Sequence, residues 1–438
     1  MASEKRRRLR PEPKQLTADE AHIRRSVNRK PVQFEASGFG IMNAIHGAFI
    51  NPLLVERGAS PIALGVFNSG ANAFLYSAGF IGPRVAYRVG NLGKAVLAIL
   101  LVTRIILFSL VAFMWAVPDG AVWPLLGIVL IWTAGEGLAT PLWTAFVAGL
   151  VPAHQRGRWL AMRGAAAATA SAGVMLILFI LLQFVSKEDV LPLAYSLAAM
   201  ASAFSLFQLR SLFRINPEQI PPKPKSFRSF PEGRERRRFL GGVFVFWFGA
   251  GFVFPILPAF IINILGAPTA YFAFAGVLAA VVTATVQRRW GRHGDQHGPK
   301  AMVYYSGIGA SAVPILWALV PVYQAGPLVE VVASSAWPGH TLGLTMRAVE
   351  LAESDEDRST MIAWTSLAQG AGACISPLVA SLLVSTTGTI ALLIVSAVLR
   401  LVGTIIISEA EREGWFRGRG PIRRLNSRRI RRAALSQS

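Results

Sequence analysis

The chain has 438 residues, of which 53% are hydrophobic and 15% are charged, and its mean hydropathy is +0.47. This composition lies outside the range of soluble domains and indicates a membrane protein. The formal net charge is +21, and three segments (1–33, 210–238 and 409–438) each contribute +6 of it. Basic segments outside apolar runs orient a protein in a bilayer, so we expect no nucleic-acid partner.

Cys374 is the only cysteine, which excludes an intrachain disulfide and a cysteine-based metal site. We expect neither a metal nor a cofactor. The basic start of the chain is not followed by a short apolar core with a small-residue cleavage site, so we expect no removable signal peptide.

A bilayer core takes about 20 apolar residues per helix. The sequence predicts a basic N-terminal arm over 1–33, a bundle of six spans over 34–213, a basic linker over 214–238, a second bundle of six spans over 239–408 and a basic tail over 409–438. The expected spans are 36–55, 60–82, 93–117, 122–151, 158–186, 190–213, 239–265, 268–287, 301–323, 327–346, 359–384 and 388–408. The predicted fold class is therefore an all-α membrane protein of twelve helices in two pseudo-symmetric six-helix bundles.

Lys and Arg concentrate in alternate turns between the expected spans. The turns after spans 2, 4 and 8 hold Arg84, Arg88, Lys94, Arg156, Arg158, Arg163, Arg288, Arg289, Arg292 and Lys300. The intervening turns hold few basic residues. Because cytoplasmic loops carry the excess of Lys and Arg, we expect both termini in the cytoplasm and the protein in the cytoplasmic membrane.

Two glycine-containing basic turns, after spans 2 and 8, occupy equivalent places in the two bundles and predict a parallel six-span repeat. They also resemble the signature turn of the major facilitator superfamily, a group of secondary transporters. The second copy supplies Gly291, Asp295, Gly298 and Lys300 on the signature spacing, with Gln296 in place of a basic residue. The first copy keeps Arg88, Gly90 and Lys94, but has Tyr87 in place of the aspartate and Pro83 in place of the first glycine.

The chemistry of such a turn can be stated from its residues. Glycines permit a tight return between helices, and a carboxylate on the turn can accept hydrogen bonds from the free N–H groups at a nearby helix start. That contact would make the turn a gating loop that holds one conformation. The alternative is a short basic turn that only fixes topology.

Ionisable residues inside apolar spans are candidates for function because burying them is costly. Glu136 in span 4 and His46 in span 1 both fall near the middle of the membrane. The family resemblance implies that spans 1 and 4 line one central cavity. A carboxyl group and an imidazole can each load and release a proton, so we predict Glu136 as the coupling carboxylate and His46 as relay or substrate contact. The alternative is a structural salt bridge between Glu136 and Arg104 of span 3.

Amides and aromatic residues supply the candidates for substrate contact. In the first bundle they are Asn43, Asn68 and Asn72, which could instead bind one another between helices. In the second bundle they are Trp337 and His340, beside the helix-breaking Pro338, together with Gln369 in span 11. Ordinary packing is the alternative for each aromatic residue.

These features predict a secondary active transporter that moves a small neutral or amphipathic solute by alternating access, driven by protons. Few charges and many aromatic residues favour efflux, and uptake of a sugar or other small metabolite is the alternative. A third possibility is a non-transporting assembly scaffold. Motifs of enzymes are absent from the sequence, so we expect no enzyme. The expected partners are the solute, protons and the bilayer, with anionic lipid at the basic linker and tails, and we expect a monomer.

Overall fold

The computed structural model describes residues 30–117, 120–150, 156–213 and 230–409, and within these ranges the chain is helical without strands. The helices of the first half are α3 (Lys30–Glu56), α4 (Pro61–Val89), α5 (Leu92–Ala116), α6 (Val122–Leu150), α7 (Arg156–Leu181) and α8 (Lys187–Phe213). Those of the second half are α9 (Arg234–Ala259), η2 (Phe260–Ile264), α10 (Ala270–Leu319), η3 (Tyr323–Ala325), α11 (Gly326–Glu350), α12 (Asp355–Thr387) and α13 (Thr389–Ser408). Nearly all of the predicted arm, much of the linker and nearly all of the tail lie outside the described residues.

Helix α10 contains two of the predicted spans. Its two parts meet at Gly298, whose backbone angles of φ 83° and ψ 168° are not helical. With α10 counted as two, the α-helices of the described ranges number twelve, and the predicted all-α fold is confirmed. By length and composition, nine helices of the described residues could cross a membrane, and α10 counts once among them. Helices α4 and α11 are not among the nine.

Local sequence sets the ends of several helices. Ser60 caps the start of α4 by accepting a hydrogen bond from the backbone N–H of Ala63, and Pro61 has the fixed φ that suits a first helical position. At the other end, Gly90 adopts a left-handed φ of 72° that a side chain would disfavour. Asn91 then caps α5 by accepting from the N–H of Lys94 at 2.8 Å. Two residues therefore suffice to reverse the chain between α4 and α5.

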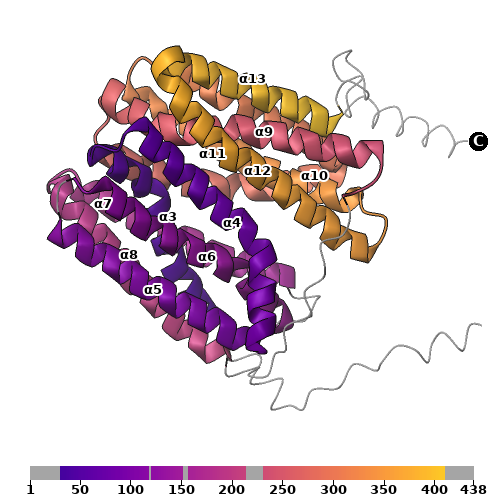
Figure 1. Cartoon of the computed structure of the whole chain (residues 1–438), viewed down its shortest axis with the longest axis horizontal. Coiled ribbons are helices and arrows are strands. Elements are labelled where there is room, and N and C mark those ends of the chain that lie inside the picture. Colours follow the sequence, from indigo (N-terminus) through magenta and orange to yellow (C-terminus); the bar gives the residue numbers. More distant parts are fainter. Residues whose placement is uncertain (1–29, 118–119, 151–155, 214–229, 410–438) are drawn as a thin grey trace, which may run out of the picture.

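Figure 1 shows the two halves side by side, with α3–α8 in indigo to magenta and α9–α13 in pink to yellow. Two helix pairs make most of the contact between them, α4 with α12 and α7 with α10. Glycines let some of these helices approach closely. A Cβ atom at Gly276 of α10 would lie 3.1 Å from Cγ of Met175 on α7, which is tighter than an ordinary contact. Small residues at helix crossings are typical of membrane bundles.

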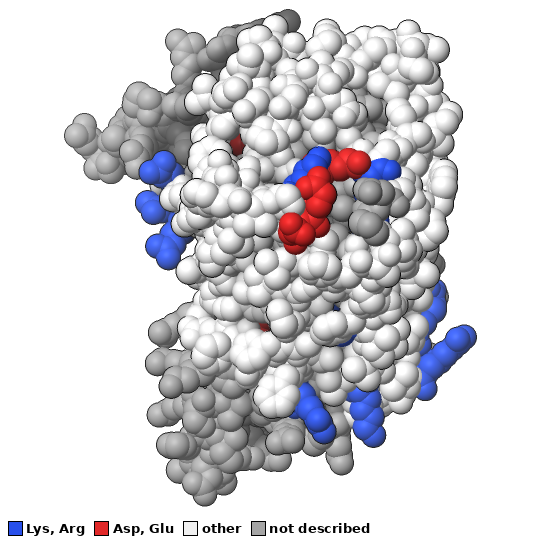
Figure 2. Space-filling view, turned by 90° about the vertical axis from the view of Figure 1, so that its left-hand side faces the viewer, with Lys and Arg blue, Asp and Glu red and all other residues white. Residues whose placement is uncertain are grey.

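The two ends of the bundle differ in charge. We call the end where α3 leads into α4 the Glu56 end, and the end where α4 leads into α5 the Gly90 end. Turns at the Glu56 end hold both acidic and basic residues (Glu56, Arg57, Lys187, Glu188 and Asp189), whereas the Gly90 end holds the arginine-rich turns. Figure 2 shows a largely uncharged surface with one compact group of acidic and basic side chains and basic side chains along its margins.

Candidate functional site

The carboxylate of Glu136 on α6 forms an ion pair with the guanidinium of Arg104 on α5. Both side chains are largely buried, with exposed fractions of 18% and 5%. Arg104 also donates to the backbone oxygen of Ser202 on α8 at 3.2 Å and to Thr103 Oγ1 at 3.0 Å. The arrangement is the salt bridge that the sequence offered as the alternative to a proton-coupling role for Glu136.

His46 of α3 lies against Trp132 of α6, with ring centroids 4.3 Å apart in an edge-to-face arrangement. His46 Nδ1 and Trp132 Nε1 are buried and bond to none of the described residues. Trp132 precedes Glu136 by four residues, so both side chains lie on the same face of α6. His46 therefore contacts α6 one helical turn before Glu136.

The asparagines of the first half mostly satisfy one another. Asn68 Nδ2 donates to Asn51 Oδ1 at 3.0 Å and to the backbone oxygen of Leu64 at 2.9 Å. Asn72 Nδ2 donates to the backbone oxygen of Asn68 at 2.7 Å. Asn43 is exposed on α3. Asn68 is therefore engaged between α3 and α4, whereas Asn43 and the amide oxygen of Asn72 have more freedom to contact a solute.

Aromatic rings surround His340 in the second half. His340 of α11 is fully buried and stacks on Phe246 of α9, with ring centroids 3.7 Å apart. Trp337 packs edge-on against the same Phe246, and the guanidinium of Arg400 lies 5.6 Å from the Trp337 ring. Arg400 is 2% exposed and donates to the backbone oxygens of Ala310 and Ala250. The predicted pair Trp337 and His340 thus lies together, and a buried cation adjoins it.

Aromatic contacts cross between the halves, and one of them lies beside Trp337. Tyr76 of α4 and Trp247 of α9 have ring centroids 6.2 Å apart, and Trp247 in turn lies 5.6 Å from Trp337. Tyr76 also packs on α12 at Gly370, where a Cβ atom would overlap the tyrosine. Gln369, the residue before it, is half-buried. The sequence candidates Trp337 and Gln369 are therefore brought near the boundary between the halves, beside Tyr76.

At the Glu56 end, a hydrogen bond joins the two halves. Thr269 Oγ1, just before α10, donates to Glu56 Oε1 at 2.6 Å. Lys187 Nζ of α8 lies 3.5 Å from the same carboxylate, which is 10% exposed. Glu56 of the first half is therefore bonded to Thr269 of the second half. The ammonium group of Lys187, in the first half, partly neutralises the Glu56 carboxylate.

The predicted gating-loop residues form a tight turn in the first half but lie mostly within a helix in the second half. Arg88 and Gly90 end α4, as a tight turn requires. In the second half the prediction of a turn beginning after 287 is wrong, because α10 stays helical through Gly291 and Asp295 and breaks only at Gly298. Asp295 is exposed, and its predicted bond to a helix start is not among the contacts of the described residues.

Lys300, the last gating-loop residue, makes an ion pair that the sequence did not suggest. Its Nζ lies 2.6 Å from Glu409 Oε2, just after α13. Arg347 at the end of α11 adds bonds to Glu235 at 2.5 Å and Glu350 at 2.7 Å. This network of ion pairs, in place of a capping aspartate, joins the helix ends of the second half at the Gly90 end.

Sequence reasoning also missed the pair formed by Glu35 and Arg163. Arg163 of α7 donates to both carboxylate oxygens of Glu35 at 3.0 and 3.1 Å, and its guanidinium lies 3.9 Å from the Trp143 ring. The predicted first span begins at 36, so Glu35 fell just outside it and carried no prediction. The available signal was its position within a continuous apolar helix, which makes a solvated carboxylate costly.

Comparison with solved structures identifies chains of the same architecture. A POT family transporter in complex with a thioalcohol conjugated peptide is 14% identical, covers 89% of this chain and 96% of its own, and has a TM-score of 0.68. The human organic anion transporter MFSD10 is 15% identical, with coverage of 86% and 98% and a TM-score of 0.61. The xylose transporter XylE from E. coli is 13% identical, with coverage of 90% and 96% and a TM-score of 0.58.

Models of protein families and curated protein sequences give no match to this chain. The structural likeness therefore rests on geometry at 13–15% identity, which shows the fold. The chain therefore shares the fold of these solved transporters.

The ion pair of Arg104 and Glu136 gives a testable prediction for stability. Replacing one member of a buried pair leaves an uncompensated charge and costs about 3–5 kcal/mol. We expect Glu136→Gln to lower the free energy of unfolding by about that amount, and the double variant Arg104→Gln/Glu136→Gln to regain most of it. Denaturant unfolding in detergent micelles measures both. A single variant as stable as the wild type would show that the pair contributes nothing.

Proposed function

We propose that the chain is a secondary active transporter that moves a small solute by alternating access between its two halves. Support comes from how the buried clusters are distributed. At the Glu56 end, one hydrophobic cluster combines residues of α3–α8 with Ala273 of α10, and further residues of α9 and α10 pack against it. Toward the Gly90 end, one cluster belongs wholly to the first half and another wholly to the second.

This distribution fits a protein in one state of a rocking cycle. The halves share a core at the Glu56 end, so that end is closed. Near the Gly90 end each half has its own hydrophobic core. The halves can therefore separate there without exposing a hydrophobic core that both of them share. Rigid-body motion of one bundle against the other around a site near the membrane midplane is how such repeats alternate access.

The solute we propose is neutral or amphipathic. Tyr76, Trp247 and Trp337 supply aromatic surface near the boundary between the halves, and Asn72 and Gln369 supply amide groups. Ligand sites are typically apolar and aromatic with a few polar groups for orientation. We favour efflux, and uptake of a small metabolite is the second candidate, because XylE with the same fold is a xylose transporter.

Proton coupling through Glu136 with His46 as relay is part of the proposal. In the structure the carboxylate is paired with Arg104, so protonation has to compete with the guanidinium. Protonation would release the carboxylate from the guanidinium, so proton binding at Glu136 and the ion pair with Arg104 would be linked. His46 lies against Trp132, one helical turn from Glu136 along α6, and an imidazole can both accept and donate a proton.

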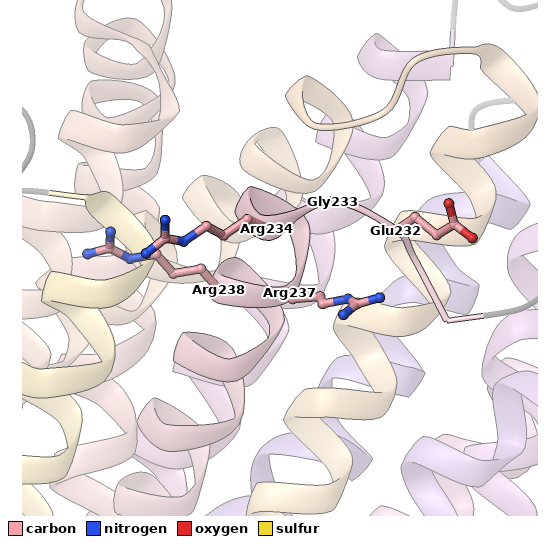
Figure 3. A pocket seen from close by; sticks show the side chains of 5 residues that line it. All are labelled: Glu232, Gly233, Arg234, Arg237 and Arg238. Atoms are coloured by element: carbon pink, nitrogen blue, oxygen red, sulfur yellow. The ribbon is translucent and has the colours of Figure 1, made fainter.

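The Gly90 end faces the cytoplasm in this proposal, because the arginine-rich turns collect there. The start of α9 adds a basic cavity of about 780 Å³, lined by Glu232, Gly233, Arg234, Arg237 and Arg238. Figure 3 shows Arg234 and Arg238 extending to one side of the helix and Arg237 to the other. Anionic lipid headgroups fit such a surface.

The proposal predicts a solute that both binds and crosses the membrane. The purified chain is first screened for a rise in melting temperature with alanyl-alanine, D-xylose, 5-aminolevulinic acid and a hydrophobic dye, since a bound ligand stabilises the native state. The solute that binds is then followed in proteoliposomes with an imposed pH gradient. We expect flux that an ionophore for protons abolishes. Binding without flux would favour the assembly scaffold.

The same assay tests the role of Glu136. The double variant Arg104→Gln/Glu136→Gln avoids the unpaired arginine, so it separates coupling from folding. If Glu136 carries the proton, the variant keeps its fold but loses accumulation driven by the pH gradient while still exchanging solute downhill. Accumulation equal to the wild type would assign the pair a purely structural role.

The link between Glu56 and Thr269 predicts a shift between states. Spin labels at Val185→Cys and Val322→Cys, in a Cys374→Ser background, report the distance between the halves at the Glu56 end. We expect Thr269→Val, which removes the donor, to increase the population with a longer distance by about fivefold, the effect of losing a hydrogen bond of about 1 kcal/mol. Electron–electron dipolar spectroscopy measures the two populations.

The control for that measurement is Lys187→Met, which removes the cation 3.5 Å from Glu56 but breaks no bond between the halves. We expect it to leave the distance distribution close to the wild type. Equal distributions for Thr269→Val and the wild type would mean that the hydrogen bond does not hold the closed end.

A further inference from the structure

We propose that His293 and His297, on the last turns of the first part of α10, form a binding site for a divalent transition-metal ion such as Zn²⁺, Ni²⁺ or Cu²⁺. This inference departs from the sequence expectation of no metal, which considered cysteine ligands. It is independent of the transport proposal, because it rests only on the local geometry of this helix end.

The spacing and geometry of the two imidazoles suit a shared metal. Residues four apart lie on the same helix face, which is the arrangement by which paired histidines on a helix hold zinc. The ring centroids of His293 and His297 are 4.4 Å apart and the ring planes differ by 21°. Two nitrogens that each bind Zn²⁺ at about 2.0–2.1 Å lie up to about 4 Å apart. Small side-chain rotations therefore bring one nitrogen of each ring to a common ion.

Each ring has a nitrogen free for this role. His297 Nδ1 lies 3.3 Å from the backbone oxygen of His293. If Nδ1 carries the proton and donates there, Nε2 presents its lone pair, which is how backbone carbonyls orient histidine ligands at metal sites. His293 Nε2 is buried and bonds to none of the described residues. A metal would satisfy this otherwise unpartnered nitrogen.

Neighbouring aromatic residues hold His293 in place. Its ring contacts Trp290 and Tyr305 edge-on, with centroids 5.7 Å apart in both cases. Trp290 Nε1 donates to the backbone oxygen of Ser335 on α11 at 2.6 Å, and Gly339 leaves room for its indole. Trp290, which is fixed to α11, therefore restricts the ring of His293. Because this ring is already held in place, less conformational entropy is lost when it binds a metal.

The surroundings select the class of metal. Arg289 and Arg292 are exposed on the same turns, so the local charge is positive and repels cations. Mg²⁺ and Ca²⁺ prefer oxygen ligands and gain little from imidazole, whereas Zn²⁺, Ni²⁺ and Cu²⁺ bond well to it. The described residues contain no group of three or more metal-ligating side chains, so water completes the coordination and affinity is moderate.

A metal at this position would reinforce the helix end next to the break at Gly298. It would bridge the last helical turn just before the chain changes direction toward Lys300 and its ion pair with Glu409. The site thus lies in the segment that resembles the family's signature turn. A bound metal would stabilise the helical conformation of that segment, so the stability of the segment would depend on metal concentration.

Calorimetric titration of the full chain in detergent, without a histidine tag, tests the site with ZnCl₂, NiCl₂ and MgCl₂ as probes. We expect one Zn²⁺ per chain that depends on both histidines, a comparable response to Ni²⁺ and none to Mg²⁺. His293→Ala and His297→Ala should each weaken Zn²⁺ binding tenfold or more, since even changes to residues that only orient a ligand cost about 10–100-fold. Gln296→Ala, an exposed residue of the same turn whose amide is a poor ligand for these metals, is the control and should leave binding unchanged.

A spectroscopic readout separates a ligand from a merely structural histidine. The electron paramagnetic resonance spectrum of bound Cu²⁺ should show coupling to two nitrogens in the wild type and to one in His297→Ala. Should His293→Ala lower the melting temperature, His297→Ala still decides the question, because its side chain is half-buried and lies at the helix end. Absence of a stoichiometric Zn²⁺ site in the wild type, or wild-type Zn²⁺ affinity in His297→Ala, would overturn the proposal.

Discussion

Polar groups inside a membrane bundle have to find partners within the protein, because the surrounding lipid offers none. This constraint explains the bonds of the buried polar residues in both halves. Arg104 is bonded to Glu136, Ser202 and Thr103, and Arg400 is bonded to two backbone oxygens and covered by the Trp337 ring. A guanidinium has five donors, so it can join several helices at once. The two buried arginines therefore fix helix positions within each half.

Contacts between the halves are of a different kind. They consist mainly of apolar side chains and close approaches at glycines, together with the hydrogen bond between Glu56 and Thr269 at one end. Strong ion pairs such as Glu35 with Arg163 or Lys300 with Glu409 stay within a half. Ion pairs and buried arginines therefore strengthen each half from within, whereas apolar packing and the bond between Glu56 and Thr269 connect the two halves.

Much of the fold was predictable from the sequence, because hydropathy and the positions of Lys and Arg locate most helices and the ends where they turn. The exception was the segment after 287, whose glycines and charges are typical of a turn. There the helix continues to His297, and Trp290 anchors it to α11 through Ser335. A contact between helices, which the local sequence does not reveal, decided the conformation of this segment.

The candidate site was predictable only in part. A charged pair at comparable depth suggested the bond between Arg104 and Glu136, because lone charges in a membrane are costly. The bond between Glu56 and Thr269 joins residues 213 positions apart, and neither residue is unusual in its own turn. Likewise, Tyr76 meets Trp247 and Gly370 only because α4 packs against the other half. Contacts of this kind depend on the placement of whole helices.

A disulfide between α7 and α10 tests most directly whether the halves move against each other at the Glu56 end. A Cβ atom at Gly276 would lie 3.8 Å from that of Met175, the usual separation across a disulfide. The variant Met175→Cys/Gly276→Cys, in a Cys374→Ser background, is oxidised in proteoliposomes and assayed for exchange of the bound solute. The account predicts that the oxidised protein exchanges no solute and that reduction restores exchange. Undiminished exchange by fully cross-linked protein would contradict it.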